Sequence, residues 1–195
     1  SFKESRREDA PINRMVKHLF HFSHIEGRIR PFTPTHGSDE RQYCSPGFNL
    51  PVGQMARTVY GSYPGYHNSL DTKESMTISA LLRSVNELEE VLKAVELEGY
   101  YLNQSPYGEV KLDQHNLYPD MNAPSMRGKS TNDLTDQRKQ LNRILMLLNY
   151  ADGEHTLREI AETCKCSIFE LQPILEVLKE KALLKGPYLE RGLLT

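Results

Sequence analysis

Apolar residues recur at intervals of three and four positions in both halves of the chain, which is the spacing of amphipathic helices. The first such segment predicts a helix over residues 10–23, with Asp9 as its N-cap and Pro11 in its first turn. The most regular segment runs from Ile78 to Val95, with charged residues on its other side, and Gly99 stops it. The first half therefore contains at least two helices.

The last third of the chain has the element order of a winged helix. A helix ends at Asp152-Gly153, and two capping boxes follow, Thr156 to Glu159 and Ser167 to Glu170. These boxes predict two further helices, over residues 157–163 and 168–182. A strand and turn are then expected over residues 183–189.

The segments between the helices supply the strand candidates. Arg28 to Phe32 is a short strand candidate, and Pro46 to Val52 is typical of a turn that feeds a buried strand. Helices alternating with strands predict a layered α/β domain followed by the winged helix. Residues 100–131 lack periodicity and are rich in Pro and Gly, which is typical of a linker or strap. The expected domains are therefore 1–120 with its strap, a linker over 121–134, and 135–195.

Composition narrows the function classes. The 195 residues are 38% hydrophobic and 26% charged, with a net charge of −2, as in a soluble globular protein without general attraction to nucleic acid or anionic membranes. No apolar run could span a bilayer. The three cysteines lack the spacing of a disulfide framework, so we expect a reducing, cytoplasmic location. The chain begins Ser-Phe-Lys, without Met or a signal peptide, as a processed product or a piece of a longer protein would.

Two polar clusters bracket a stretch rich in Gly, Pro and Tyr between Ser38 and Thr72. His67 lies in the second cluster, four residues before Asp71. A neutral imidazole is a good zinc ligand, and a carboxylate that accepts its second N–H would orient the ring. The alternative is a loop histidine bonded to backbone. Asp39, in the first cluster, is either a site carboxylate or part of a solvated charged run.

Other residues with reactive side chains favour structural interpretations. Cys44 has no flanking pattern of a nucleophile, so a buried thiol is expected. Cys164 and Cys166 lack the spacing of common zinc motifs, and packing is the better interpretation. Three histidines at intervals of three on the first helix could face a metal, but no carboxylate alternates with them: His18, His21 and His24.

The charges of the winged helix discourage a DNA-binding function. The recognition-helix candidate carries Glu170, Glu176 and Glu180, and its first turn lacks Arg and Lys. An acidic residue there repels phosphate, so nucleic acid is not the expected partner. Docking onto the first domain or onto a protein is favoured instead.

Three segments together resemble a bacterial and archaeal family of aminopeptidase-like proteins with a C-terminal winged helix, often linked to surface polysaccharide biosynthesis. They are residues 3–7, 39–53 and the Tyr-Leu-Asn-x-x-Pro-Tyr-Gly run at 101–108. The Tyr66 to Thr72 element is similar to that of the wider zinc aminopeptidase and glutaminyl cyclase superfamily. The likeness covers nearly the whole chain.

The resemblance implies roles for individual residues. His67 corresponds to the last zinc ligand of the superfamily, and Asp71 and Tyr66 would support that ligand without touching the metal. Asp39 corresponds to an aspartate near the metal that helps to hold substrate or relay a proton. Position 68 is Asn where Thr is usual.

The resemblance also implies that this chain is incomplete as an enzyme. The superfamily's earlier His and Asp ligands and its general-base Glu precede this segment, and nothing before His36 supplies them. Metal-dependent hydrolysis needs an activated water and a base. We therefore expect the C-terminal part of a zinc hydrolase acting on a peptide-like or amide substrate, inactive alone and completed by upstream residues. The alternative is an inactive, peptidase-like binding module that acts through its winged helix, and a homo-oligomer is open under either hypothesis.

Overall fold

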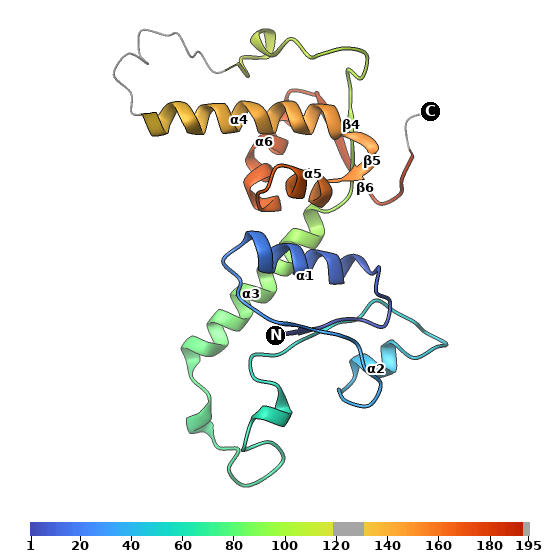
Figure 1. Ribbon diagram of the computed structural model, residues 1–195, viewed down its shortest axis with the longest axis vertical. Helices are drawn as coiled ribbons and strands as arrows, with labels where there is room; N and C mark the ends of the chain where they lie inside the picture. Colours follow the sequence, from blue (N-terminus) through green and yellow to red (C-terminus); the bar gives the residue numbers. More distant parts are fainter. Residues whose placement is uncertain (119–130, 193–195) are drawn as a thin grey trace. The chain divides into compact units, whose positions relative to one another are not determined.

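The computed structural model describes residues 1–118 and 131–192, with side chains described for 1–118 and 135–192. The chain divides into two compact units, Ser1–Glu96 and Leu97–Thr195. Each unit contains its own three-stranded sheet and its own helices, which Figure 1 labels. The mixed α/β class that the sequence predicts is confirmed.

The sheet of the first unit is built from strands of two residues each. Strand β1 (Phe2–Lys3) is central, with β2 (Ile29–Arg30) parallel on one side and β3 (Gln54–Met55) antiparallel on the other. The expected strand at Arg28 to Phe32 is thus present in shorter form. The strand expected after Pro46 begins later, at β3, and both its residues are half-buried, so the expectation of a buried strand is wrong. Leu50 and Val52 instead take part in turn hydrogen bonds with Tyr43 and with each other.

Helix α1 (Pro11–Phe22) supplies three of the nine buried apolar residues of the first unit, more than any other element. Its buried face follows the predicted spacing and packs with apolar residues from the flanking segments: Phe2, Ala10, Met15, Val16, Leu19 and Ile25. The expected cap at Asp9 is wrong. Ala10 occupies the N-cap position, and no side chain caps the helix.

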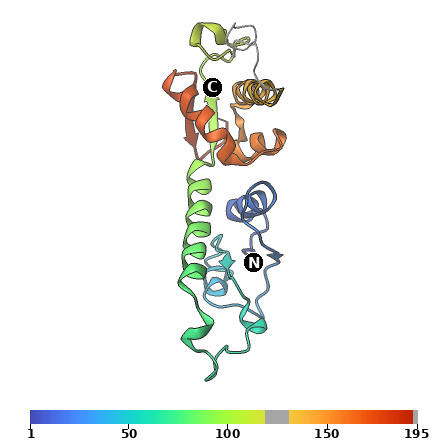
Figure 2. The same cartoon turned by 90° about the vertical axis from the view of Figure 1, so that its left-hand side faces the viewer.

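The remaining elements of the first unit are short, apart from one long helix. They are α2 (Glu40–Tyr43), the 3-10 turns η1 (Tyr60–Ser62) and η2 (Lys73–Ser75), and the helix α3 (Ile78–Leu97). Figure 2 shows α3 along its full length. It buries only Val91 and Ala94, so most of its apolar face is open.

The second unit is a winged helix. Strand β4 (Tyr100–Asn103) lies between β5 (Asp152–Thr156) and β6 (Leu184–Tyr188), antiparallel to both. The other elements are η3 (Leu112–His115), α4 (Thr131–Tyr150), α5 (Leu157–Thr163) and α6 (Ile168–Glu180). A compact core joins them: Leu147, Leu157, Ile160, Ile168, Leu171, Leu175 and Leu178.

Both predicted capping boxes are present in this unit. The Thr156 hydroxyl accepts from the Glu159 backbone N–H, and the Glu159 carboxylate accepts from the Thr156 N–H. Ser167 and Glu170 form the same reciprocal pair at the start of α6. Each box satisfies backbone donors that a helix start otherwise leaves free, which explains why these two helix starts could be located in advance.

The division between the units differs from the expected boundary at 121–134. Residues 100–103 form the central strand of the second sheet, so they are not a strap of the first domain. Tyr101 is fully buried there. The four residues are too few to show a period, and their pairing partners lie about 50 and 85 positions further along the chain. Most of the expected linker lies outside the described residues.

We predict that a fragment of residues 97–192 unfolds cooperatively in urea, whereas a fragment of residues 121–192 does not. The shorter fragment lacks β4, which leaves β5 and β6 unpaired and removes Tyr101 from the core. Circular dichroism during urea titration measures the difference. Equal urea midpoints for the two fragments would instead support a domain boundary at residues 121–134.

Candidate functional site

A buried ion pair joins the first strand to the segment that carries Asp39. The Nζ atom of Lys3 lies 2.8 Å from Oε1 of Glu40, and the two side chains are only 1% and 3% exposed. Lys3 also donates to the carbonyl oxygens of Thr33 and His36. Its three N–H donors are therefore all used, as a buried ammonium group requires.

Glu40 is satisfied on its other oxygen as well. Oε2 accepts from the Ser38 backbone N–H at 2.8 Å. Gly37 makes room for this carboxylate: a Cβ there would lie 1.8 Å from Oε1 of Glu40, and its φ of +145° is one that other residues rarely adopt. The turn before α2 is thus built around the Glu40 side chain.

Burial alone raises the pKa of Glu40, but the hydrogen bonds from Lys3 and from the Ser38 N–H outweigh it. The pKa of Glu40 consequently lies below its ordinary value. The carboxylate is held ionised beside Lys3, and the position of α2 depends on that charge.

Asp39 precedes α2 and points into solvent. Its carboxylate does not cap the helix, and it makes no hydrogen bond or ion pair with any other described residue. Asp39 is therefore an unengaged carboxylate at the N-cap of a short helix. The residue after it, Glu40, is held in place by Lys3 and by the Ser38 N–H. That arrangement leaves Asp39 available to a ligand.

Side chains connect the two family-like segments of the first unit, residues 3–7 and 39–53. Besides the Lys3–Glu40 pair, Nη1 of Arg6 donates to Oδ1 of Asn49 at 2.9 Å. The Ser5 N–H donates to Oδ1 of Asn13 on α1. Cys44 is buried, and its thiol lies 3.4 and 3.3 Å from the carbonyl oxygens of Leu50 and Val52. The expected packing role of Cys44 is confirmed.

His67 lies in the loop between η1 and η2, in the left-handed region with φ of +58°. Its ring stacks on Tyr66, with centroids 3.8 Å apart and an angle of 17° between the planes. Asn68 stabilises the loop by accepting from the Leu70 N–H at 2.9 Å. The imidazole is exposed, and its nitrogens bond to none of the described residues.

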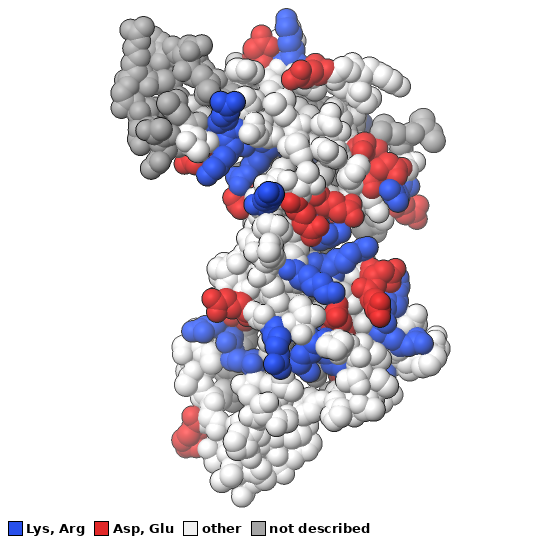
Figure 3. All heavy atoms as spheres, viewed as in Figure 1, with Lys and Arg blue, Asp and Glu red and all other residues white. Residues whose placement is uncertain are grey.

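Asp71 is engaged differently from what was expected. Its Oδ1 accepts from the Tyr63 hydroxyl at 2.8 Å, and no hydrogen bond joins it to His67 within residues 1–118. The loop from Thr58 to Leu70 contains no charged residue, which agrees with the large white area at one end of the first unit in Figure 3. Asp71 thus braces the loop through Tyr63.

The described residues do not by themselves form a metal centre. No group of three or more His, Cys, Asp or Glu side chains in these ranges is arranged to hold an ion. Figure 1 shows the loop between η1 and η2 and the helix α2 in different parts of the first unit, and no hydrogen bond or ion pair within residues 1–118 joins Asp39 to His67. The histidines expected on the first helix form no metal site either: His18 is buried, and His24 lies beyond the end of α1 at Phe22 and pairs with Glu90 at 3.2 Å.

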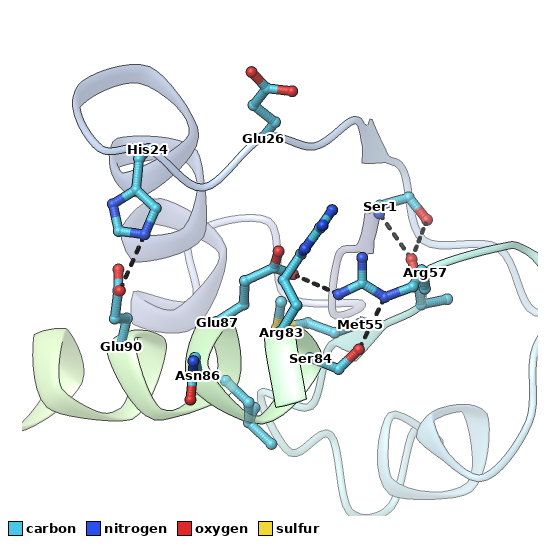
Figure 4. A pocket seen from close by; sticks show the side chains of 12 residues that line it. Ser1, His24, Glu26, Met55, Arg57, Arg83, Ser84, Asn86, Glu87 and Glu90 are labelled. Carbon is cyan, nitrogen blue, oxygen red and sulfur yellow. Dashed lines mark hydrogen bonds and ion pairs between the residues drawn. The ribbon is translucent and has the colours of Figure 1, made fainter. Parts of the chain in front are cut away.

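A cavity of about 740 Å³ lies between β3 and α3 in the first unit. Figure 4 shows Arg57 reaching from the strand side to Ser84 and Glu87 on α3, at 2.9 and 3.4 Å. Acidic and basic side chains line it in comparable numbers, so its charge selects no class of ligand. It includes neither Asp39 nor His67.

Two family matches divide the chain within two residues of the division between the structural units. Residues 99–186 match a winged helix-turn-helix family. Residues 1–98, half of the chain, match a family described as a domain of unknown function, DUF4910. The chain belongs to the DUF4910 family.

Relatives of this DUF4910 chain are named for peptidases. It is 33% identical over 161 residues to a Clostridium acetobutylicum protein named "Putative polysaccharide biosynthesis protein with aminopeptidase-like domain", covering 83% of this chain and 34% of that protein. A crystal structure of a "putative peptidase" from the same organism superposes with a TM-score of 0.71 at 29% identity, over 94% of this chain and 38% of that one. The chain thus spans about a third of the length of these relatives.

The winged helix and the aminopeptidase-like likeness inferred from the sequence are therefore confirmed at the level of fold and family. The Lys3–Glu40 pair was missed, although Lys3 and Glu40 both lie in segments that carried the resemblance. Their separation of 37 positions hides the contact from any local pattern. Within the described ranges, no helix has both the length and the apolar character needed to cross a membrane.

We predict that Lys3→Met and Glu40→Gln each lower the free energy of unfolding of the DUF4910 domain by about 3–5 kcal/mol, because either change leaves a buried charge without its partner. Hydrogen exchange of peptides covering β1 and α2 measures the loss. The matched control is Asp9→Asn, which removes an exposed ion pair to Arg7 and should cost less than about 1 kcal/mol. Equal effects of the two kinds of change would contradict a structural role for the buried pair.

The stability of the same domain should also depend on pH through Glu40. A carboxylate with a lowered pKa in the folded state contributes stability above its unfolded pKa, near 4.5, and that contribution is lost as the pH falls through the folded value. Urea midpoints measured from pH 7 down to pH 3 should fall less steeply below pH 4.5 for Glu40→Gln than for the wild type. Parallel curves would show that other carboxylates control acid unfolding.

Proposed function

We propose that this chain is the C-terminal portion of a zinc-dependent aminopeptidase-like hydrolase, to which it contributes one metal ligand, His67. The observation that carries the proposal is the state of that imidazole. It is exposed, stacked on Tyr66 in a braced loop, and its nitrogens have no partner among the described residues. A ring that stacking holds in place, with both nitrogens exposed, is suited to bind zinc through one of them.

The other proposed residues have supporting positions. Asp39 offers an unengaged carboxylate, suited to hold substrate or to relay a proton. Asp71 and Tyr66 keep the His67 loop in shape, through the Tyr63 hydroxyl and through ring stacking. The described residues alone do not fit a zinc site, so the remaining ligands and the general base must come from elsewhere in a longer polypeptide.

The apolar face of α3 supports an association with more protein. Seven of its residues are between 42% and 77% exposed: Ile78, Leu81, Leu82, Val85, Leu88, Leu92 and Val95. A stripe of this kind on a helix is ordinarily buried against another element. Since the relatives are about three times longer, we propose that their upstream peptidase-like region is what covers this face.

The substrate class proposed is a peptide-like compound or a small amide. The name of the relative places that protein in polysaccharide biosynthesis. An amidated sugar precursor and a free peptide N-terminus are therefore both candidate substrates. The winged helix would then serve for docking, because the first turn of α6 presents Glu170 and no basic residue.

A second candidate function is a peptidase-like binding module without catalysis. It is favoured by the absence of a complete metal-ligand set among the described residues. The two hypotheses differ in one measurable property, the zinc content of the whole polypeptide.

We predict that the intact polypeptide containing this chain binds stoichiometric zinc and that His67→Ala loses it, as measured by inductively coupled plasma mass spectrometry. His21→Ala, another exposed histidine of the same unit, is the matched control and should retain zinc. Asp39→Asn should keep the metal but lower kcat against aminoacyl amides by about 100-fold or more. A folded intact protein without zinc would favour the binding module.

We also predict that the upstream region, expressed as a separate polypeptide, binds this chain and that Leu81→Glu with Leu92→Glu abolishes the binding. Two charges would be buried without partners in an apolar interface. Exchanging Glu89 and Lys93, an exposed ion pair on the same helix, is the control and should preserve binding. Self-association of this chain through the α3 face, detected by light scattering, would instead identify a second copy as the occupant.

A further inference from the structure

A groove runs along one face of α4 in the winged helix, where two cavities share part of their lining. The first, of about 680 Å³, lies between α4 and the turn that joins α5 to α6. The second, of about 540 Å³, lies between α4 and residues 103–110, the segment that includes and follows the end of β4. Leu145 and Met146 line both cavities, so the two meet over these side chains. Figure 1 shows α4 with the segment after β4 on one side and α6 on the other.

The floor of this α4 groove is a stripe of the helix with an apolar middle. Its residues recur at intervals of three and four positions, the spacing that places side chains on one face of a helix. They are Lys139, Asn142, Leu145, Met146 and Asn149. Leu145 and Met146 are half-buried, and Val110 adds apolar surface from the segment opposite. The middle of the groove therefore suits an apolar side chain of a ligand.

Two asparagine side chains flank this apolar middle along the helix. Asn142 and Asn149 are exposed, and neither side chain makes a hydrogen bond with another residue in the described ranges. Each amide has donors and an acceptor, so it can bond both the N–H and the C=O of one residue of an extended chain. Seven positions of an α-helix span about 10.5 Å, and three residues of an extended chain span about 10 Å. The two amides are therefore spaced to bind residues i and i+3 of an extended peptide.

The end of the groove at the α5–α6 turn carries positive charge. Three basic side chains and one acidic side chain line the first cavity: Lys139, Arg143, Lys165 and Glu170. Arg143 and Glu170 are ion-paired with each other, so their charges offset. Lys165 has no ion pair with any residue that the structure describes, and Lys139 lies 3.7 Å from Asp136 with its own side chain 62% exposed. Two ammonium groups are therefore available to an acidic ligand.

The distribution of charge favours a peptide over a nucleic acid. A nucleic-acid strand carries a negative charge at every phosphate and is bound by positive charge along its length. In the α4 groove, available cations line the end at the α5–α6 turn, whereas Glu109 and uncharged side chains line the other end. The apolar floor between the two ends is complementary to a side chain that a peptide can supply.

We propose that the α4 groove binds an extended peptide segment of a partner protein, in which acidic residues lie beside an apolar residue. The apolar side chain contacts Leu145 and Met146, the two asparagine amides bond the peptide backbone, and the carboxylates lie near Lys139 and Lys165. The proposal rests on the docking role proposed for the winged helix and not on the hydrolase function, because every group involved belongs to the winged helix.

The first test is the selection of phage-displayed random peptides of about 12 residues on the immobilised full chain. Enriched peptides should contain acidic residues within about three positions of an apolar residue more often than the unselected library does. Fluorescein-labelled synthetic copies should bind the chain in fluorescence anisotropy. Raising NaCl from about 50 mM to about 500 mM should weaken that binding by about 10-fold, because salt screens the exposed lysines. No enrichment, or enrichment of peptides without acidic residues, would overturn the proposal.

The second test reverses the charges of the groove. Lys139→Glu with Lys165→Glu should weaken binding of the enriched peptide by about 10-fold or more, because two attractions become repulsions. The matched control is Lys179→Glu with Lys185→Glu, which changes the net charge equally at exposed residues that do not line the groove. This control should weaken binding by less than about 3-fold, since distant exposed charges are screened. Equal effects of the two double variants would overturn the proposed site.

The third test removes the two amides. Asn142→Ala with Asn149→Ala should weaken binding by about 10-fold, because two hydrogen-bonding side chains are lost. Its salt dependence should match that of the wild type, because no charge changes. Circular dichroism establishes that each variant is folded. An unchanged affinity in this folded variant would overturn the extended binding mode.

Two further measurements separate a peptide from other occupants of the groove. Duplex DNA of about 20 base pairs that displaces the peptide would identify a nucleic-acid site. Self-association of the wild type that Lys139→Glu with Lys165→Glu abolishes, seen by light scattering, would identify a second copy of the chain. Either result would overturn the proposal. The zinc content of the intact polypeptide should be the same with and without the groove variants, so the hydrolase function is tested separately.

Discussion

The first unit depends on the burial of one ammonium and one carboxylate, those of Lys3 and Glu40. Removing both charges from water is costly, and the cost is offset only because every donor of Lys3 and both oxygens of Glu40 have partners. A sheet of two-residue strands has few ladder hydrogen bonds with which to define its geometry. The ion pair adds a strong contact between β1 and the start of α2. It thereby fixes the position of the backbone that carries Asp39.

The two units differ in how far they bury their own apolar side chains and provide partners for their own polar ones. The winged helix has a closed core, two capping boxes and a buried Arg158 that contacts three carboxylates. The DUF4910 domain leaves an apolar helix face, an imidazole and a carboxylate exposed. The first unit thus leaves groups of three kinds without partners among the described residues, whereas the winged helix has the organisation of an independently folding part.

The candidate site was only partly accessible to sequence reasoning. His67, Asp39 and Asp71 could be singled out because Gly, Pro and Asn make most of the stretch around them irregular and because the segments resemble a known family. The contacts that these residues make could not be predicted. Asp71 bonds Tyr63, and the ring of His67 stacks on Tyr66, neither of which the spacing of these residues reveals.

By itself the sequence determined the elements whose cause is local. Helix α5, the starts of α5 and α6 and the apolar face of α1 follow from capping residues and from a period of 3.6, which act within a few positions. Only the tertiary structure decided that Tyr100–Asn103 is the central strand of the second unit and that Lys3 pairs with Glu40. Both depend on partners at least 37 positions away, and the energy that selects such partners comes from burial, which exists only once the chain has folded.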